Sequence, residues 1–230
     1  VDSAVLAVHP LAKLKPVKHA DNSRVRYLTS DEEARLFQAM DSREYEAKAA
    51  RERFNTWRQQ RGKDLLPQIE YYSDHLKPIV LLALNTGMRR GEIFYLVWSD
   101  IDFLHNKLTV RSAAAKTGKR RIIPINLSTR TVLTNWKQQQ SDPPQTEYVL
   151  PGKNGERLDN IDSAWKNLIR VASIEDFNFH DLRHCFATNT LRAGADITTV
   201  SKLLGHATLA MPMKYAHVKD EAMAEAVNRL

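Results

Sequence analysis

Two short strand-like segments interrupt a chain whose other periodic segments are helical. Residues 106–110 read NKLTV and residues 120–125 read RRIIPI, and both are rich in β-branched and aliphatic residues. The turn that joins them is basic and contains Thr117-Gly118. One pair of strands predicts a single antiparallel hairpin, so helices must supply most of the core. We therefore expect a mainly α fold with a small antiparallel β-sheet or hairpin, of the α+β class.

Helical patterns cover most of the remaining chain. Ser30 followed by Glu33 forms a capping box and predicts a helix start just before an apolar repeat. The later segments carry amphipathic or apolar repeats, and several of them end at a glycine. They cover residues 43–61, 74–85, 89–98, 128–139, 160–172, 180–193, 197–204 and 219–230.

The composition excludes several classes of protein. With 230 residues, 43% of them hydrophobic, the chain can bury a sizeable core. Its longest apolar run, at 78–84, falls far short of the roughly 20 residues that span a bilayer. Cys185 is the single cysteine, which rules out an intrachain disulfide and a cysteine-based zinc cluster. We expect a cytoplasmic protein with no membrane segment and no secretory signal.

The charge distribution indicates a polyanionic partner, most often nucleic acid. The formal net charge is +7, which alone is a weak signal. The stretch RSAAAKTGKRR at 111–121 holds basic residues and no acid, and it covers the hairpin turn. Its basic side chains are Arg111, Lys116, Lys119, Arg120 and Arg121. Residues 1–26 are also basic, contain two prolines and lack a sustained period, so we expect a linker or arm there.

Two clusters of functional residue types lie in the central part of the sequence. In TGMRRGE (86–92) a glycine turn precedes Arg89, and Glu92 follows three residues later on the same helical face. Taken alone, this pair is an ordinary surface ion pair. The basic turn of the hairpin is the second cluster, and alone it is a solvated turn or a non-specific phosphate contact.

Two further clusters lie near the C-terminus. In HDLRH (180–184) an imidazole from His180 and a guanidinium from Arg183 share one helical face, and His184 lies nearby. This arrangement suits an anionic ligand, but it lacks the second ligand pair that a metal site needs. In LLGHATLAMPMKYAHV (203–218) His206 follows a glycine, and Tyr215 comes nine residues later. Alone, that tyrosine is an amphipathic surface residue.

Together the four clusters resemble the catalytic domain of the tyrosine recombinases, the phage integrase family. The matching motifs are TGxRxxE, the hairpin lysine, HxxR, LLGH and the terminal tyrosine, with WSDID before the strands in support. The resemblance covers roughly residues 27–218 and is most like the integrases of prophages and genomic islands. It implies attack of a tyrosine hydroxyl on a DNA phosphodiester, a 3′-phosphotyrosyl intermediate and no need for ATP, metal or another cofactor.

The resemblance also implies a role for each residue. Arg89 and Arg183 would each donate two parallel N–H bonds to the phosphate, which a lysine cannot do. Lys116 would protonate the leaving 5′-oxygen, with Lys119 as an alternative in the same turn. His180 would assist proton transfer at the tyrosine and His206 would donate a hydrogen bond to a phosphate oxygen. Tyr215 would be the nucleophile. Glu92 would orient Arg89 or the histidine helix, and the other basic residues of the turn, Arg111, Arg120 and Arg121, would contact DNA.

The domain organisation follows from the same resemblance. Residues 1–26 would be a basic linker or arm without the family's N-terminal core-binding domain, residues 27–218 the catalytic domain, and 219–230 a C-terminal helix that packs in cis or on a neighbouring protomer. The partner would be double-stranded DNA in a bacterial cell, with a homotetramer on DNA and a monomer for the isolated domain. Pro212, three residues before Tyr215, departs from the family pattern and bears on how the tyrosine is placed. Two alternatives stay open: a catalytically silent DNA-binding module of this fold, and a type IB topoisomerase-like DNA-relaxing enzyme.

Overall fold

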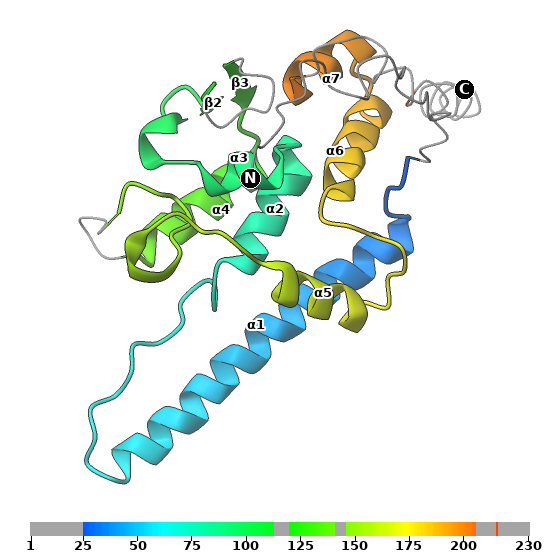
Figure 1. Cartoon of the computed structure of the whole chain (residues 1–230). Coiled ribbons are helices and arrows are strands. Elements are labelled where there is room, and N and C mark those ends of the chain that lie inside the picture. Colours follow the sequence, from blue (N-terminus) through cyan, green and yellow to red (C-terminus); the bar gives the residue numbers. More distant parts are fainter. Residues whose placement is uncertain (1–24, 113–119, 141–145, 206–214, 216–230) are drawn as a thin grey trace, which may run out of the picture.

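The computed structural model describes residues 25–112, 120–140, 146–205 and 215 (Figure 1). Several sequence predictions fall outside these residues, and they concern Lys116, Lys119, His206, the helix at 219–230 and the arm before residue 25.

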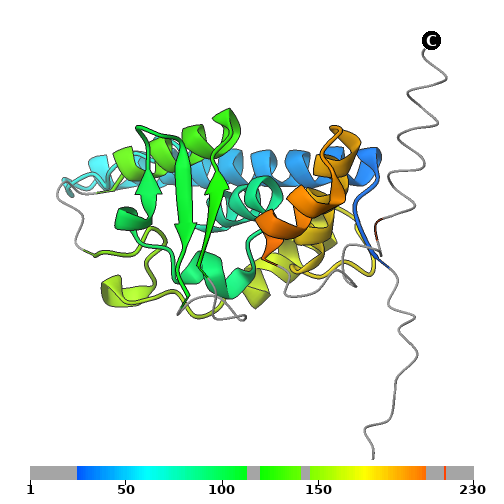
Figure 2. The ribbon, with the colours of Figure 1, turned by 90° about the horizontal axis from the view of Figure 1, so that it is seen from above.

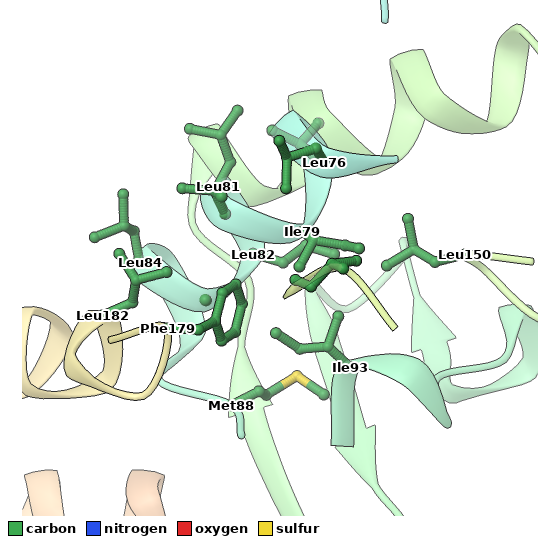
Figure 3. Packing of buried hydrophobic residues seen from close by; sticks show 14 of the residues in the cluster. Leu76, Ile79, Leu81, Leu82, Leu84, Met88, Ile93, Leu150, Phe179 and Leu182 are labelled. Atoms are coloured by element: carbon green, nitrogen blue, oxygen red, sulfur yellow. The ribbon is translucent and has the colours of Figure 1, made fainter. Parts of the chain in front are cut away.

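The fold is built around α2 (Leu76–Thr86), a helix that is apolar on all sides. Nine of its eleven residues are buried, as expected for a helix without a polar face. It packs against α4 (Leu127–Gln138) on one side and α6 (Asp181–Arg192) on another. Figure 3 shows its leucines and Ile79 meeting Phe179 and Leu182 from the α6 region. This buried helix places its own C-terminal end, and the residues that follow it, inside the molecule.

A three-stranded antiparallel sheet lies beside the helices. The strands are β1 (Ile101–Asp102), β2 (Lys107–Val110) and β3 (Arg121–Pro124), in the order β1-β2-β3. Ile101, Leu108 and Ile123 are paired across the three strands and are all buried, so one face of the sheet belongs to the core. The mainly helical α+β fold with a small antiparallel sheet is confirmed. The two-residue strand β1 was not predicted, because it is too short to show an alternation.

The first helix, α1 (Ser30–Gln59), is longer than predicted. Its N-cap is Thr29, which forms the capping box with Glu32, one residue earlier than the expected pair of Ser30 and Glu33. Residues 43–61 do not form a separate helix, because no glycine or proline interrupts the chain before Gly62. A helix of 30 residues is about 45 Å long, and Figure 1 shows its second half extending away from the body.

The helix expected over 89–98 is much shorter. It is α3 (Arg90–Phe94), followed by the 3-10 helix η1 (Trp98–Asp100). The chain leaves the helix because Leu96 accepts a main-chain hydrogen bond from Val149 (2.9 Å) and Trp98 donates one to Glu147 (3.0 Å). Long-range main-chain pairing therefore outweighs the local helical pattern here.

The remaining described α-helices lie close to their predicted ranges. The 3-10 helix η2 (Lys153–Gly155), which was not predicted, precedes α5 (Asp162–Val171), and α5 packs on α1. The last described helix, α7 (Ile197–Leu204), ends at Gly205 in the left-handed conformation and packs against both α6 and β3. Figure 2 shows α7 and α6 together at one end of the sheet. The C-terminal ends of α2 and α7 and the first residue of β3 therefore surround one region of the molecule, where the candidate site lies.

Candidate functional site

Arg183 lies where three helices meet. It comes from α6, and only 3% of the residue is exposed. Its Nη1 donates to the carbonyl of Gly87 at the end of α2 (2.7 Å), and its Nη2 donates to the carbonyl of Leu204 at the end of α7 (2.5 Å). A helix C-terminus leaves carbonyl groups without intrahelical donors and carries partial negative charge, so a guanidinium is a fitting partner for both ends.

Glu92 connects two further arginines. Its side chain is 1% exposed, and its carboxylate accepts from Nη1 of Arg89 (3.1 Å) and from both terminal nitrogens of Arg121 (2.9 and 2.6 Å). Its Oε2 also accepts the main-chain N–H of Arg89 (2.8 Å) at the start of α3. The expected supporting contact between Glu92 and Arg89 is therefore present in the structure.

The cluster has an excess of positive charge. Arg89, Arg121 and Arg183 are three guanidinium groups, and Glu92 is the carboxylate that lies among them. The pKa of Arg183 is lowered to about 9, first by burial and then by the nearby charges of Arg89 and Arg121, against the opposing effect of Glu92. Burial raises the pKa of Glu92, but the hydrogen bonds and charge of Arg121, together with the main-chain N–H of Arg89 and the charge of Arg183, bring it below its ordinary value. An added anion would balance this excess.

Tyr215 lies beside this cluster and is almost fully buried, with 2% of the residue exposed. Its hydroxyl forms a short hydrogen bond with Nδ1 of His184, and the two rings are 5.7 Å apart. His180 stands edge-on to His184, also at 5.7 Å between ring centroids. Burial raises the pKa of Tyr215 to about 12, and the charge of Arg183 acts in the opposite direction. The phenol is therefore protonated at neutral pH and is not an activated nucleophile in this state.

An open cleft borders the cluster at Arg89. It has a volume of about 1000 Å³, and its charged lining consists of Arg89, Arg90, Lys166 and Arg170 with the acidic residues Asp162 and Glu175, beside His180. The side chain of Arg89 is 22% exposed, so of the two arginines predicted to bind phosphate it is the accessible one. Basic side chains therefore outnumber acidic ones in the cleft, and Arg89 connects it to the buried guanidinium cluster.

The structure brings together five of the sequence-predicted residues: Arg89, Glu92, Arg183, His180 and Tyr215. Arg120 is exposed at the end of the hairpin turn, as a DNA contact would be. Arg111 is half-exposed and bonds to Asp100 (3.1 Å) and to the carbonyl of Tyr95 (2.9 Å). Arg121 differs from its prediction as a DNA contact, because its side chain turns inward to Glu92 and is only 8% exposed.

His184 is the residue that sequence reasoning undervalued. The HDLRH motif places His184 near His180, but the motif alone assigns it no part in the site. The signal was its spacing, since residues four apart on a helix lie on the same face. That spacing could show that the two imidazoles are neighbours. It could not show that the hydroxyl of Tyr215, 31 residues further along, would lie against the second of them.

The part of the chain that the structure describes has neither a cluster of metal-ligand side chains nor a membrane-spanning helix. No group of three or more histidine, cysteine, aspartate or glutamate side chains is placed to hold a metal ion among those residues. None of the described helices is both long enough and apolar enough to cross a membrane.

A family model described as the phage integrase family matches residues 26–222. The chain belongs to the phage integrase family. Among curated relatives, the tyrosine recombinase XerA of Pyrococcus furiosus is 38% identical over 155 residues, which cover 66% of this chain and 53% of the relative. The integrase of Salmonella phage P22 is 28% identical over 173 residues, 70% of this chain and 44% of that protein. This family member thus spans about half the length of the curated relatives it matches.

Solved structures share the fold. The crystal structure of XerA recombinase has a TM-score of 0.64 at 27% identity, over 89% of this chain and 64% of that one. The catalytic domain of bacteriophage HP1 integrase has a TM-score of 0.55 at 23% identity, over 89% of this chain and 94% of that one. The second match covers nearly all of a protein described as a catalytic domain, so this integrase-family chain has the fold of that domain.

Proposed function

We propose that this chain carries the catalytic domain of a site-specific DNA recombinase or integrase, over residues 27–218, and that Tyr215 is its nucleophile. The observation that carries the proposal is the cluster of Arg89, Arg121 and Arg183 around one buried carboxylate, with a tyrosine hydroxyl beside it. Related proteins support the choice of substrate. Solved structures of this fold include XerH site-specific recombinase bound to its difH substrate and the Tn1549 transposon integrase in complex with DNA.

The reaction would run as follows. The Tyr215 oxygen forms a bond to the phosphorus of one DNA strand, and the bond from phosphorus to the 5′-oxygen breaks. The phenol proton passes to a histidine, for which His180 in the cleft is our candidate, and Lys116 supplies the proton that the departing 5′-oxygen needs. Arg89 and Arg183, with His206, would stabilise the charge that gathers on the non-bridging phosphate oxygens. Loss of one such donor typically lowers the rate by about 10²–10³.

The chemistry is reversible without ATP. The phosphotyrosyl ester keeps the energy of the original phosphodiester, so a different 5′-hydroxyl can attack it and reseal the DNA. Exchange between paired strands requires several subunits, and we propose a homotetramer on double-stranded DNA and a monomer without it. Because the hydroxyl of Tyr215 is buried against His184, we propose that it moves away from His184 when it attacks a phosphate bound in the cleft.

A nicked duplex tests the assignment. The DNA that flanks the gene is cut into 40-base-pair duplexes with a nick near the centre, so that cleavage releases a short fragment and traps the enzyme. We expect a covalent protein–DNA adduct with the unaltered chain and none with Tyr215→Phe. Equal adduct from both proteins would refute the role of Tyr215, and no adduct from either would favour the silent DNA-binding alternative.

A second measurement addresses the DNA-relaxing alternative. Supercoiled plasmids that carry one or two copies of the trapped site are incubated with the protein. Recombinant products from the two-site plasmid support the proposal. Efficient relaxation of both plasmids with no recombinant product would instead indicate a topoisomerase-like enzyme.

A further inference from the structure

Arg121 joins three parts of the site. It is the first residue of β3 and lies directly after the basic turn of the hairpin. Its Nη1 and Nη2 bind the two carboxylate oxygens of Glu92, and its Nε donates to the carbonyl of Leu203 near the end of α7 (2.8 Å). One buried guanidinium therefore contacts the helix that follows Arg89 and the helix that precedes His206.

The contact with α7 is close as well as polar. Gly205 ends α7 with φ of +66°, and a Cβ placed on it would lie 2.9 Å from Cδ of Arg121. The glycine thus serves both the left-handed turn and the passage of the Arg121 side chain across it. Arg121 and Arg183 then hold neighbouring carbonyls, those of Leu203 and Leu204, from two different elements.

The charge balance explains what Arg121 does for Arg89. A buried carboxylate needs compensating charge and hydrogen bonds. With Arg121 in place, Glu92 has a bidentate partner, and the guanidinium of Arg89 bonds to the carboxylate through Nη1 alone. Without Arg121, Glu92 would have to bind Arg89 more fully or take up a proton. Either change would alter the direction in which the Arg89 guanidinium faces the cleft.

We propose that Arg121 is a positioning residue, which sets the orientation of Arg89 through Glu92 and fixes the end of α7 next to Arg183. The proposal rests on the proposed function, because it assigns Arg121 to the same phosphate site. It replaces the direct DNA contact that the basic sequence of the turn suggests for this residue. Arg120, the exposed neighbour, keeps that role and provides a matched control.

Single-turnover cleavage of the nicked duplex and DNA binding at several salt concentrations separate the two roles. For Arg121→Gln we expect the cleavage rate at saturating DNA to fall by about 10- to 100-fold, since small misplacements of a catalytic group have effects of this size. The slope of log affinity against log salt concentration should stay unchanged. Arg120→Gln should instead lower the slope by about one, and Arg53→Gln, at an exposed residue of α1, should leave both the slope and the rate unchanged.

A double variant with Glu92 tests whether Arg121 acts on Arg89 through Glu92. If Arg121 acts through Glu92, the double variant Arg121→Gln/Glu92→Gln should be about as slow as the slower single variant. The rate of Arg121→Gln should also drop more steeply than that of the unaltered protein between pH 7.5 and 5.5, because burial then favours protonation of Glu92. Multiplicative losses in the double variant would overturn the route through Glu92.

A folding control keeps the outcome decisive. If circular dichroism shows that Arg121→Gln is unfolded, Arg121→Lys keeps the charge but loses the bidentate bond, and it should fold and still cleave slowly. A normal rate in Arg121→Lys, or a reduced salt slope with a normal saturating rate in Arg121→Gln, would overturn the proposal. Failure of the proposed function shows itself separately, as a missing covalent adduct in the unaltered protein.

Discussion

The hydroxyl of Tyr215 forms a hydrogen bond with Nδ1 of His184, away from open solvent. This hydrogen bond connects the end of the chain to α6, the helix that also supplies Arg183. A buried hydrogen bond of this kind contributes about 0.5–1.5 kcal/mol to stability. We predict that Tyr215→Phe lowers the free energy of unfolding in urea by that amount. Tyr95→Phe, at a residue that is 40% exposed, should change it little.

The two histidines of α6 should have separable effects. His180 lines the cleft, whereas His184 lies behind it against the tyrosine. We predict that His180→Gln lowers the cleavage rate by about 10²–10⁴, the usual range for a general acid or base. His184→Gln should affect the rate less and should lower the stability of the DNA-free protein. A larger loss of rate in His184→Gln would assign the proton transfer to His184 instead.

Arg183 should not tolerate replacement by lysine. A lysine cannot reach the carbonyls of Gly87 and Leu204 in the same planar geometry, and its ammonium would be costly to bury at this position. We predict that Arg183→Lys lowers the free energy of unfolding by about 1–3 kcal/mol and the cleavage rate by about 10²–10³. The exposed Arg53 on α1 offers a control, since Arg53→Lys should alter neither quantity.

Glu92 should make the stability depend on pH. The pKa of Glu92 in the folded protein is below its ordinary value of 4.5. Its ionised form therefore stabilises the fold above pH 4.5, and this contribution is lost as the pH falls through the folded-state pKa. We predict that the unaltered protein loses more unfolding free energy between pH 6 and pH 3 than Glu92→Gln does. Parallel curves for the two proteins would contradict this prediction.

The hairpin and most of the helices could be predicted from the sequence, because they depend on local periodicity and on residue types. Short motifs made Arg89 and Arg183 recognisable, because binding a phosphate calls for guanidinium groups. Glu92 was recognisable from its spacing of three residues from Arg89. What local patterns could not show were contacts over long separations. The basic run at 111–121 assigned Arg121 to DNA, yet its partners are Glu92 and Leu203, 29 and 82 residues away. Likewise, main-chain pairing with Val149 ended the helix expected over 89–98.

The extended part of α1 gives the last prediction, because the buried side chain of Asn55 bonds the returning chain to it. Lys48, Arg51 and Arg58 also donate to carbonyls of that segment, but through exposed hydrogen bonds. Asn55 is 5% exposed, and it donates to the carbonyl of Leu66 (2.8 Å) and accepts from its main-chain N–H (2.9 Å). Asn55→Ala would leave both groups of Leu66 without these bonds, at a cost of about 1–3 kcal/mol. This part of α1 lies away from the helices that form the site, so the loss should be local (Figure 1).

For Asn55→Ala we predict at least about fivefold faster trypsin cleavage at residues 61–63, since about 1 kcal/mol raises the open population by that factor. The rate of DNA cleavage should stay normal. The control is Thr56→Ala, which removes only an exposed hydrogen bond to the carbonyl of Glu52 within the helix and should change neither the trypsin rate nor the DNA-cleavage rate. Equal trypsin sensitivity of Asn55→Ala and Thr56→Ala would show that Asn55 does not hold the segment.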